Sequence, residues 1–206
     1  LPQVVDPDQL LTQFTGITER QVQKALMNLD PSKAPGSDGI PTRLLILSAS
    51  TIAPCIHHLY TLSLQRAVFP DDWKKATITP IYKGRGSKQM TTNYRPISLL
   101  SVLSKVLERL VFNHLYKHLN KYLPNQQSGF RKKDSTSHQL ARLVHHIAQG
   151  MDGGKTVLAC FYDLSKAFDR VWHRGLLAKL HHLGIRDAAL KWITSYLSER
   201  QQCVRI

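Results

Sequence analysis

Two carboxylates follow an apolar run in the last quarter of the sequence. The run TVLACFY, residues 156–162, has the length of a strand, and Asp163 comes directly after it. A continuous apolar run predicts a strand buried on both faces, which would hold Asp163 rigidly at the rim of a sheet. Mg²⁺ requires rigid, near-octahedral oxygen ligands, so Asp163 is a candidate metal ligand. The spacing is equally compatible with Asp163 capping the turn after the strand.

The second carboxylate, Asp169, stands six residues after the first. It lies just ahead of VWHRGLLAKL, and an Asp before a predicted helix is the common N-cap arrangement. We therefore interpret Asp169 as a cap and Asp163 as the residue that carries chemistry. A metal-bound carboxylate beside a basic surface suggests phosphoryl transfer on nucleic acid, in which two ions activate the attacking oxygen and stabilise the leaving one.

Positive charge is concentrated in one stretch of the chain. The sequence holds 28 Lys and Arg against 14 Asp and Glu, a net charge of +14, yet residues 1–70 are balanced. Between Lys74 and Lys133 there are thirteen basic residues and one acid, Glu108. Such an excess is costly unless a polyanion neutralises it, and nucleic acid is the leading partner. The alternatives are basic helices that are merely solvated and an anionic membrane surface, which the lack of one amphipathic basic run disfavours.

The elements that must position these residues are mostly helices. TERQ, residues 18–21, fits a capping box at the start of a helix. The apolar segment 44–64 predicts a buried helical pair interrupted near Pro54. Apolar residues at helical spacing predict further helices over 103–119, from about 135 to 147, over 174–183 and over 187–199. Strands are predicted over 76–82 and 155–162, so the fold class is α+β, helix-rich with a small antiparallel sheet.

The turn that ends the first predicted strand, YKGRGSK, contains two glycines. It lacks the spacing of a P-loop, and it offers Lys83, Arg85 and Lys88 beside backbone donors as an unspecific phosphate contact.

Cysteine usage and hydropathy indicate the compartment. Cys55, Cys160 and Cys203 are odd in number and far apart, which predicts a reducing environment without disulfides. No apolar run reaches the ~18 residues that would cross a bilayer, and no signal peptide is evident, so we expect an intracellular protein without a membrane partner. The sequence starts at Leu1 and ends within an apparent strand, QQCVRI, so we expect an excerpt of a longer protein.

Four blocks in fixed order carry a family resemblance. They are SKAPGSDGIP, PIYKGRGSKQMTTNYRPISLLSVLSKVLERLV, QSGFRKKDST and FYDLSKAFDRVWHRGLLAKLHHLGI. Together they resemble the reverse transcriptase of non-LTR (LINE-like) retrotransposons over nearly the whole chain. Group II intron reverse transcriptases share the general plan but match the first two blocks less closely.

The resemblance implies roles for individual residues. Asp163 matches the first catalytic aspartate, a ligand of both Mg²⁺ ions, and the backbone carbonyl of Leu164 would contact the ion that accompanies the triphosphate. Phe168 matches the steric gate that excludes a ribose 2′-hydroxyl. Lys83 and Arg95 match residues that grip the incoming triphosphate.

The resemblance also implies a fold and partners. The fold would be the fingers and partial palm of a right-hand polymerase, with a helical extension over 1–70, a fingers-like region over 71–154 and the start of the palm over 155–206. The partners would be an RNA template, a DNA primer and deoxynucleoside triphosphates, with work on nuclear DNA after cytoplasmic translation. The template path would include Arg131, Lys132 and Lys133.

One departure from the family pattern limits the expected activity. The glycine-proline-glutamine segment and the Tyr-x-Asp-Asp hairpin of the family are not in this sequence. Two-metal catalysis needs a further carboxylate, so this stretch alone is expected to bind nucleic acid but not to polymerise. The alternatives are a non-catalytic RNA-binding remnant of a mobile element and, with less support, a basic helical module that binds a protein or a membrane.

Overall fold

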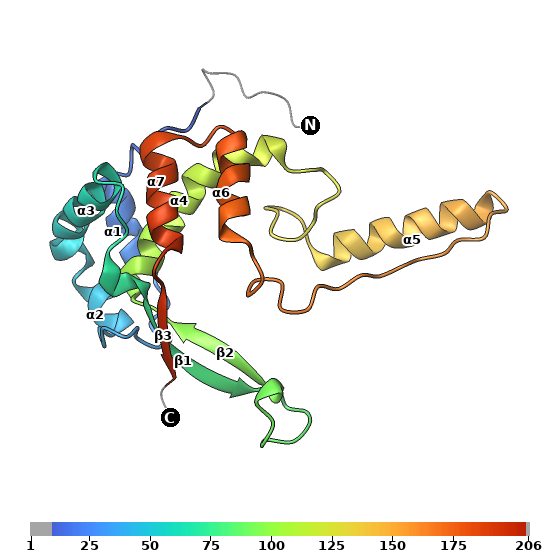
Figure 1. Ribbon diagram of the computed structural model, residues 1–206, viewed down its shortest axis with the longest axis horizontal. Helices are drawn as coiled ribbons and strands as arrows, with labels where there is room; N and C mark the ends of the chain where they lie inside the picture. Colours follow the sequence, from blue (N-terminus) through green and yellow to red (C-terminus); the bar gives the residue numbers. More distant parts are fainter. Residues whose placement is uncertain (1–9, 205–206) are drawn as a thin grey trace. The chain divides into compact units, whose positions relative to one another are not determined.

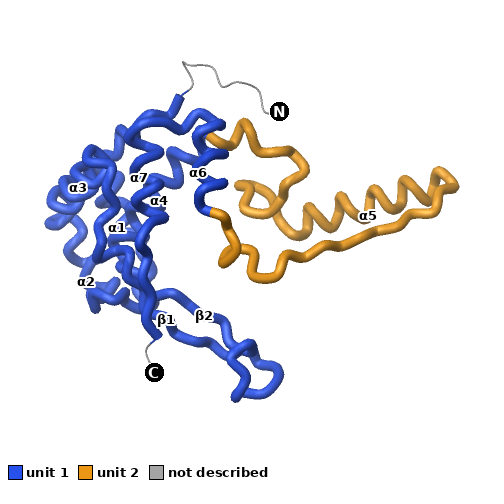
Figure 2. Tube along the Cα trace, in the orientation of Figure 1, with its two compact units in different colours: residues 1–118, 173–206 blue, residues 119–172 orange. Residues whose placement is uncertain are grey.

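The chain divides into two compact units. The computed structural model describes residues 10–204. Unit 1 comprises residues 1–118 and 173–206, and unit 2 comprises residues 119–172 (Figure 2). Between residues 10 and 204, no helix is long and apolar enough to cross a membrane.

Helices account for most of the regular structure in the described chain (Figure 1). In chain order the elements are α1 (Glu19–Met27), α2 (Thr42–Leu47), α3 (Ala49–Gln65), η2 (Asp71–Lys74), β1 (Lys75–Tyr82), η3 (Thr91–Asn93), β2 (Tyr94–Leu99), α4 (Val102–Leu119), η4 (Asn120–Tyr122), α5 (Thr136–Asp152), α6 (His173–His182), α7 (Asp187–Leu197) and β3 (Gln201–Val204).

The helices predicted from apolar spacing are confirmed, with one shifted break. The capping box of α1 forms as predicted: the Thr18 side chain accepts from the Gln21 amide, and the Gln21 side chain accepts from the Thr18 amide. The predicted helical pair is also present, but its break falls at Ser48. Pro54 lies inside α3, next to the buried Ala53, although proline cannot donate a backbone hydrogen bond to the helix.

An aromatic cluster forms the core of unit 1. Phe69 is fully buried, and its ring meets Trp73, Trp192 and Tyr196 edge-on at centroid distances of 5.8, 5.4 and 5.0 Å. The indole nitrogen of Trp192 donates to the Ser63 hydroxyl over 3.0 Å, which joins α7 to α3. Edge-to-face rings add to the burial of apolar area, so this cluster fixes the helices around the sheet.

Burial of a phenol links the cluster to α4. Tyr60 is fully buried and donates its hydroxyl to the Leu103 carbonyl over 2.7 Å. Burial raises the pKa of the Tyr60 phenol well above its usual value. The neutral phenol therefore holds α3 against the start of α4 at every physiological pH.

The sheet of unit 1 is mixed, in the order β2-β1-β3. β1 confirms the strand that the alternation over 76–82 predicted, and it forms an antiparallel hairpin with β2, a strand that was not predicted, with Ile81 opposite Arg95. β3 pairs parallel to β1, with Lys75 opposite Gln201. The α+β class is thus confirmed, but the all-antiparallel prediction is wrong because a strand distant in sequence joins the edge. The last two residues of the predicted QQCVRI strand lie outside the described residues.

Unit 2 consists of a loop, a helix and an extended return segment. α5 ends where Gly154 takes a positive φ of 69°, and the chain then runs back along the helix (Figure 1). The strand predicted over 155–162 is wrong: this segment has no strand pairing among the described residues, and Leu158 and Tyr162 are 86% and 93% exposed. Apolar composition indicates a preference for strand, but a strand also needs a neighbour to satisfy its backbone.

The predicted cap at Asp169 is also wrong. α6 begins at His173, and Asp169 lies within the turn 165–170 that precedes it. Three further residues separate Asp169 from the helix, so its carboxylate does not occupy the N-cap position.

Candidate nucleic-acid and nucleotide site

Lys83 and Arg95 share one face of the β1–β2 hairpin in unit 1. Arg95 pairs with Ile81, and the Lys83 amide extends the ladder by donating to the Asn93 carbonyl over 2.8 Å. Because side chains alternate along a strand, Ile81, Lys83 and Arg95 point to the same side. The Lys83 ammonium donates to the Thr92 carbonyl over 2.6 Å, so it is held near the hairpin tip.

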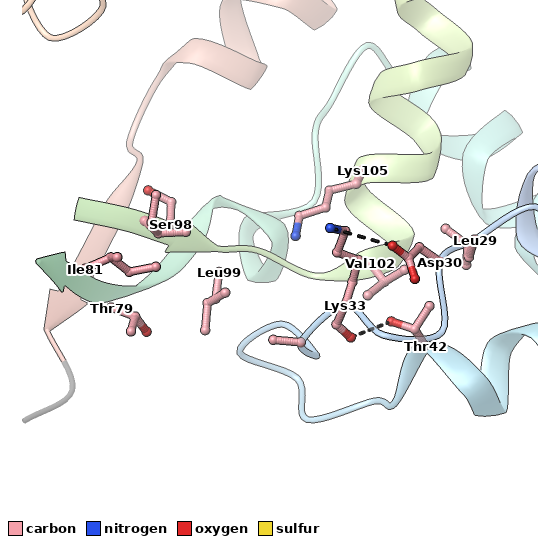
Figure 3. Close-up of a pocket in the computed structure, with 12 residues that line it drawn as sticks. Leu29, Asp30, Lys33, Thr42, Thr79, Ile81, Ser98, Leu99, Val102 and Lys105 are labelled. Carbon is pink, nitrogen blue, oxygen red and sulfur yellow. Dashed lines mark hydrogen bonds and ion pairs between the residues drawn. The ribbon is translucent and has the colours of Figure 1, made fainter. Parts of the chain in front are cut away.

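A cavity of about 600 Å³ opens on the same hairpin face (Figure 3). Figure 3 shows hairpin side chains on one side of it, with Asp30, Lys33 and Lys105 on the other. Lys33 pairs with Asp30 over 3.6 Å, and its carbonyl accepts from the Thr42 hydroxyl over 3.3 Å. The cavity therefore combines apolar walls with the Lys105 ammonium and the Lys33–Asp30 ion pair.

A basic cavity of about 310 Å³ lies in unit 2. Its lining includes all three predicted template residues, Arg131, Lys132 and Lys133, and four others: Asn125, Gln127, His138 and Arg142, with Asp134 between them. The Arg131 guanidinium donates to the Asn120 side-chain oxygen over 3.0 Å. This bond fixes one nitrogen of Arg131 and leaves the remaining donors of the fork for a phosphate.

Asp134 is the anion that organises this basic cavity. The Ser128 hydroxyl, the Ser135 amide, and the charges of Arg142 and His138 hold the pKa of the Asp134 carboxyl below its usual value. The single hydroxyl hydrogen of Ser128 serves either this carboxylate or Gln139 Oε1, which is 2.7 Å away. Asp134 thereby ties the loop before α5 to the helix.

Asp163 and Leu164 lie at the end of the extended segment, and Phe168 lies in the turn that follows. All three are exposed, and Phe168 remains 78% exposed. The turn is closed by the Arg170 amide, which donates to the Lys166 carbonyl over 3.2 Å. The structure thus presents a carboxylate and an aromatic ring to solvent within six residues, the carboxylate just before the turn and the ring on it.

The oxygen atoms at Asp163 and Leu164 are of the type that binds Mg²⁺, but they are too few to hold the ion. A carboxylate and the neighbouring Leu164 carbonyl are hard oxygen ligands, which Mg²⁺ prefers. In the described part of the chain, no three His, Cys, Asp or Glu side chains gather closely enough to hold a metal ion. The described residues therefore do not form a metal site by themselves, and no chemical step through a metal follows from them.

The predicted site residues fall into two sets. Lys83 and Arg95 belong to unit 1, and the other six belong to unit 2. Sequence reasoning did not find Asn120, Asp134, Lys33 or Lys105. Asn120 contacts Arg131 eleven residues further along the chain, and Asp134 contacts His138 and Arg142 four and eight residues further along. Lys33 and Lys105 line the same cavity only because the loop before α2 folds against the start of α4.

The described residues thus present an exposed carboxylate near an aromatic ring, and a basic cavity around Arg131. Comparison with known proteins gives the family. The reverse transcriptase (RNA-dependent DNA polymerase) family matches residues 81–205, and this chain belongs to it. The LINE-like resemblance seen in the sequence is thereby confirmed, because the relatives come from transposons of that type.

Three relatives illustrate the match. The chain is 35% identical over 97% of its length to the "Probable RNA-directed DNA polymerase from transposon BS" of Drosophila melanogaster, covering 22% of that protein. It is 34% identical over 94% of its length to the polymerase of the mobile element jockey of the same species, covering 21%. It is 30% identical over 94% of its length to the Pol polyprotein of the R2 element of Popillia japonica, covering 26%. The chain spans about a fifth to a quarter of these relatives.

Proposed function

We propose that this chain contributes the template- and nucleotide-binding part of an RNA-directed DNA polymerase that copies RNA into DNA. The substrates would be an RNA template, a DNA primer and deoxynucleoside triphosphates, and the reaction is nucleotidyl transfer. One observation carries the proposal: the family match over 81–205 contains every one of the candidate site residues.

The roles of the residues follow from their chemistry. Lys83 and Arg95 would hold the triphosphate, since both cations share one hairpin face. Asp163, with the Leu164 carbonyl, would be one part of a divalent-ion site, with Mg²⁺ as the ion and its other ligands supplied elsewhere in the polymerase. The assignment of 1–70 to a helical extension, 71–154 to fingers and 155–206 to the start of the palm is part of the same proposal.

A second function has one observation in its favour. The basic cavity around Arg131, Lys132 and Lys133 would bind RNA phosphates without any metal ion. This is compatible with a non-catalytic RNA-binding remnant of a mobile element. The two functions are separated by a chimera in which this chain replaces the matching segment of the jockey polymerase. Primer extension on an RNA template supports the polymerase, whereas RNA binding without extension supports the remnant.

Binding of single-stranded RNA by this chain should weaken steeply as salt rises. Each phosphate contact adds about −0.7 to the slope of log affinity against log salt for a single strand. Replacing Arg131 with alanine should make that slope shallower by roughly one contact and weaken binding to all sequences alike. The measurement is a fluorescence-anisotropy titration at several salt concentrations.

The matched control is Arg43→Ala. Arg43 is an exposed arginine of α2 in the charge-balanced first 70 residues, and its loss should leave the slope unchanged. Equal effects of the two substitutions would contradict a template contact at Arg131. Affinity that does not depend on salt would contradict nucleic-acid binding through phosphates.

Replacing Phe168 with alanine in the chimera should relax discrimination between deoxynucleotides and ribonucleotides. The ring would occupy the space of a 2′-hydroxyl, and alanine leaves that space empty. The measurement is the ratio of kcat/KM for a deoxynucleotide to that for the matching ribonucleotide. An unchanged ratio would show that Phe168 is not the gate.

A further inference from the structure

Phe130 has a backbone conformation that its side chain disfavours. Its φ is +61°, in the left-handed region, and its ring is 86% exposed. A bulky residue is rarely found there, because its Cβ crowds the backbone. Burial of the ring does not compensate for this strain. Strained conformations persist where the surrounding structure imposes them, often at functional sites.

The ring of Phe130 contacts Phe168. Their centroids lie 6.1 Å apart with an interplanar angle of 88°, which is the edge-to-face geometry that aromatic pairs prefer. Both residues belong to unit 2, and both rings are largely open to solvent. The contact is therefore made between two exposed side chains, outside any hydrophobic core.

The loop that carries Phe130 is held in place on both sides. Next to it, Arg131 donates its amide to the Ser128 carbonyl over 3.2 Å and its guanidinium to Asn120 over 3.0 Å. The Ser128 hydroxyl reaches Gln139 of α5, and Lys133 has a second positive φ, 66°. These bonds fix the backbone at Phe130, so the direction of its ring is set by the loop.

The turn that carries Phe168 is held by fewer hydrogen bonds than the loop that carries Phe130. It lies in a turn, 78% exposed, and its carbonyl accepts from the Val171 amide over 3.5 Å. A steric gate excludes a hydroxyl group only if its ring is held still, because an exposed ring on a turn otherwise samples several rotamers. The edge of one ring against the face of the other restricts that sampling.

We propose that Phe130 is a positioning residue that holds the Phe168 ring and thereby sets the sugar selectivity of nucleotide incorporation. The inference rests on the proposed role of Phe168 as the gate. It also links two functions on one loop, because Phe130 precedes Arg131, the proposed template contact. A bound template would then steady the loop that orients the gate.

The contact is tested first in the chain as it stands, by ¹⁹F NMR after labelling with 4-fluorophenylalanine. The chain has six phenylalanines, and Phe168→Leu identifies the resonance of residue 168. Phe130→Ala should shift that resonance toward the free amino acid. Phe112→Ala, which removes a ring that contacts Tyr116 at 5.5 Å in unit 1, should leave it in place. If the Phe168 resonance does not move in the Phe130→Ala variant, the inference is wrong.

Selectivity is tested next in the jockey chimera. Phe130→Ala should lower deoxynucleotide over ribonucleotide discrimination about 3- to 10-fold, the range that one aromatic pair supports. Phe130→Tyr keeps a ring and should retain the wild-type ratio. Phe130→Gly relieves the strained φ of residue 130. It should still lower discrimination as much as Phe130→Ala does, because both substitutions remove the ring that contacts Phe168. In a Phe168→Ala background, Phe130→Ala should have no further effect.

The outcomes separate the two proposals. If Phe168→Ala relaxes selectivity and Phe130→Ala does not, the positioning role is wrong and the gate stands. If Phe168→Ala leaves selectivity unchanged, the gate itself is wrong. An additive effect of the two alanine substitutions would mean that Phe130 acts without Phe168, which also overturns the inference.

Discussion

Primer extension by the jockey chimera is expected to disappear when Asp163 is replaced with asparagine. The loss should be at least about 100-fold, since even indirect changes around a metal site cost 10- to 100-fold. Asparagine keeps the size of the side chain but removes the charge, so it is a poor ligand for a divalent cation. The change is measured as single-turnover extension of a DNA primer on an RNA template.

RNA affinity should be nearly unchanged in the same variant. Asp163 is exposed and forms no ion pair with any other residue between 10 and 204, so asparagine disturbs no described contact. Asp169→Asn is the matched control, because that carboxylate lies on the adjoining turn and should tolerate the change. Extension that survives in Asp163→Asn would rule out the metal role, and equal losses in both variants would assign the effect to the turn.

Replacing Gly36 with alanine should cost about 3 kcal/mol of unfolding free energy. A Cβ at this position would lie 2.4 Å from the Leu100 carbonyl oxygen and 2.5 Å from the Ser101 amide nitrogen. Both are backbone atoms at the junction of β2 and α4, so neither can swing aside. The loop would have to move away, which would also displace Lys33 from the cavity.

Gly39→Ala in the same loop is the control. Gly39 has a φ of +69° with no atom within 4 Å of an added Cβ, so the cost there is backbone strain alone, about 1 kcal/mol. Urea unfolding followed by tryptophan fluorescence reports both variants, since Trp73 and Trp192 lie in the core of the same unit. Equal destabilisation by the two substitutions would contradict the close approach at Gly36.

No strand forms over 155–162, although the residue types there favour one. The run is apolar and β-branched enough to predict a strand, yet its residues stand exposed beside α5. Strand formation depends on which neighbour satisfies the backbone, and composition does not name that neighbour. Composition did not identify the neighbour of β3 either, because its parallel pairing with β1 joins positions more than 120 residues apart.

The sequence by itself determined the helices, strand β1, the charge surplus and the family. These depend on periodicity within one element, on capping residues such as Thr18, and on the chemistry of short motifs. All of these are local properties of the chain.

Only the tertiary structure decided which distant residues meet. It placed Trp192 on Ser63, Gly36 against the backbone at Leu100, Asp134 among the basic side chains of its cavity, and Phe130 on Phe168. Such contacts depend on the path of the chain between two elements, and no spacing along the sequence encodes that path.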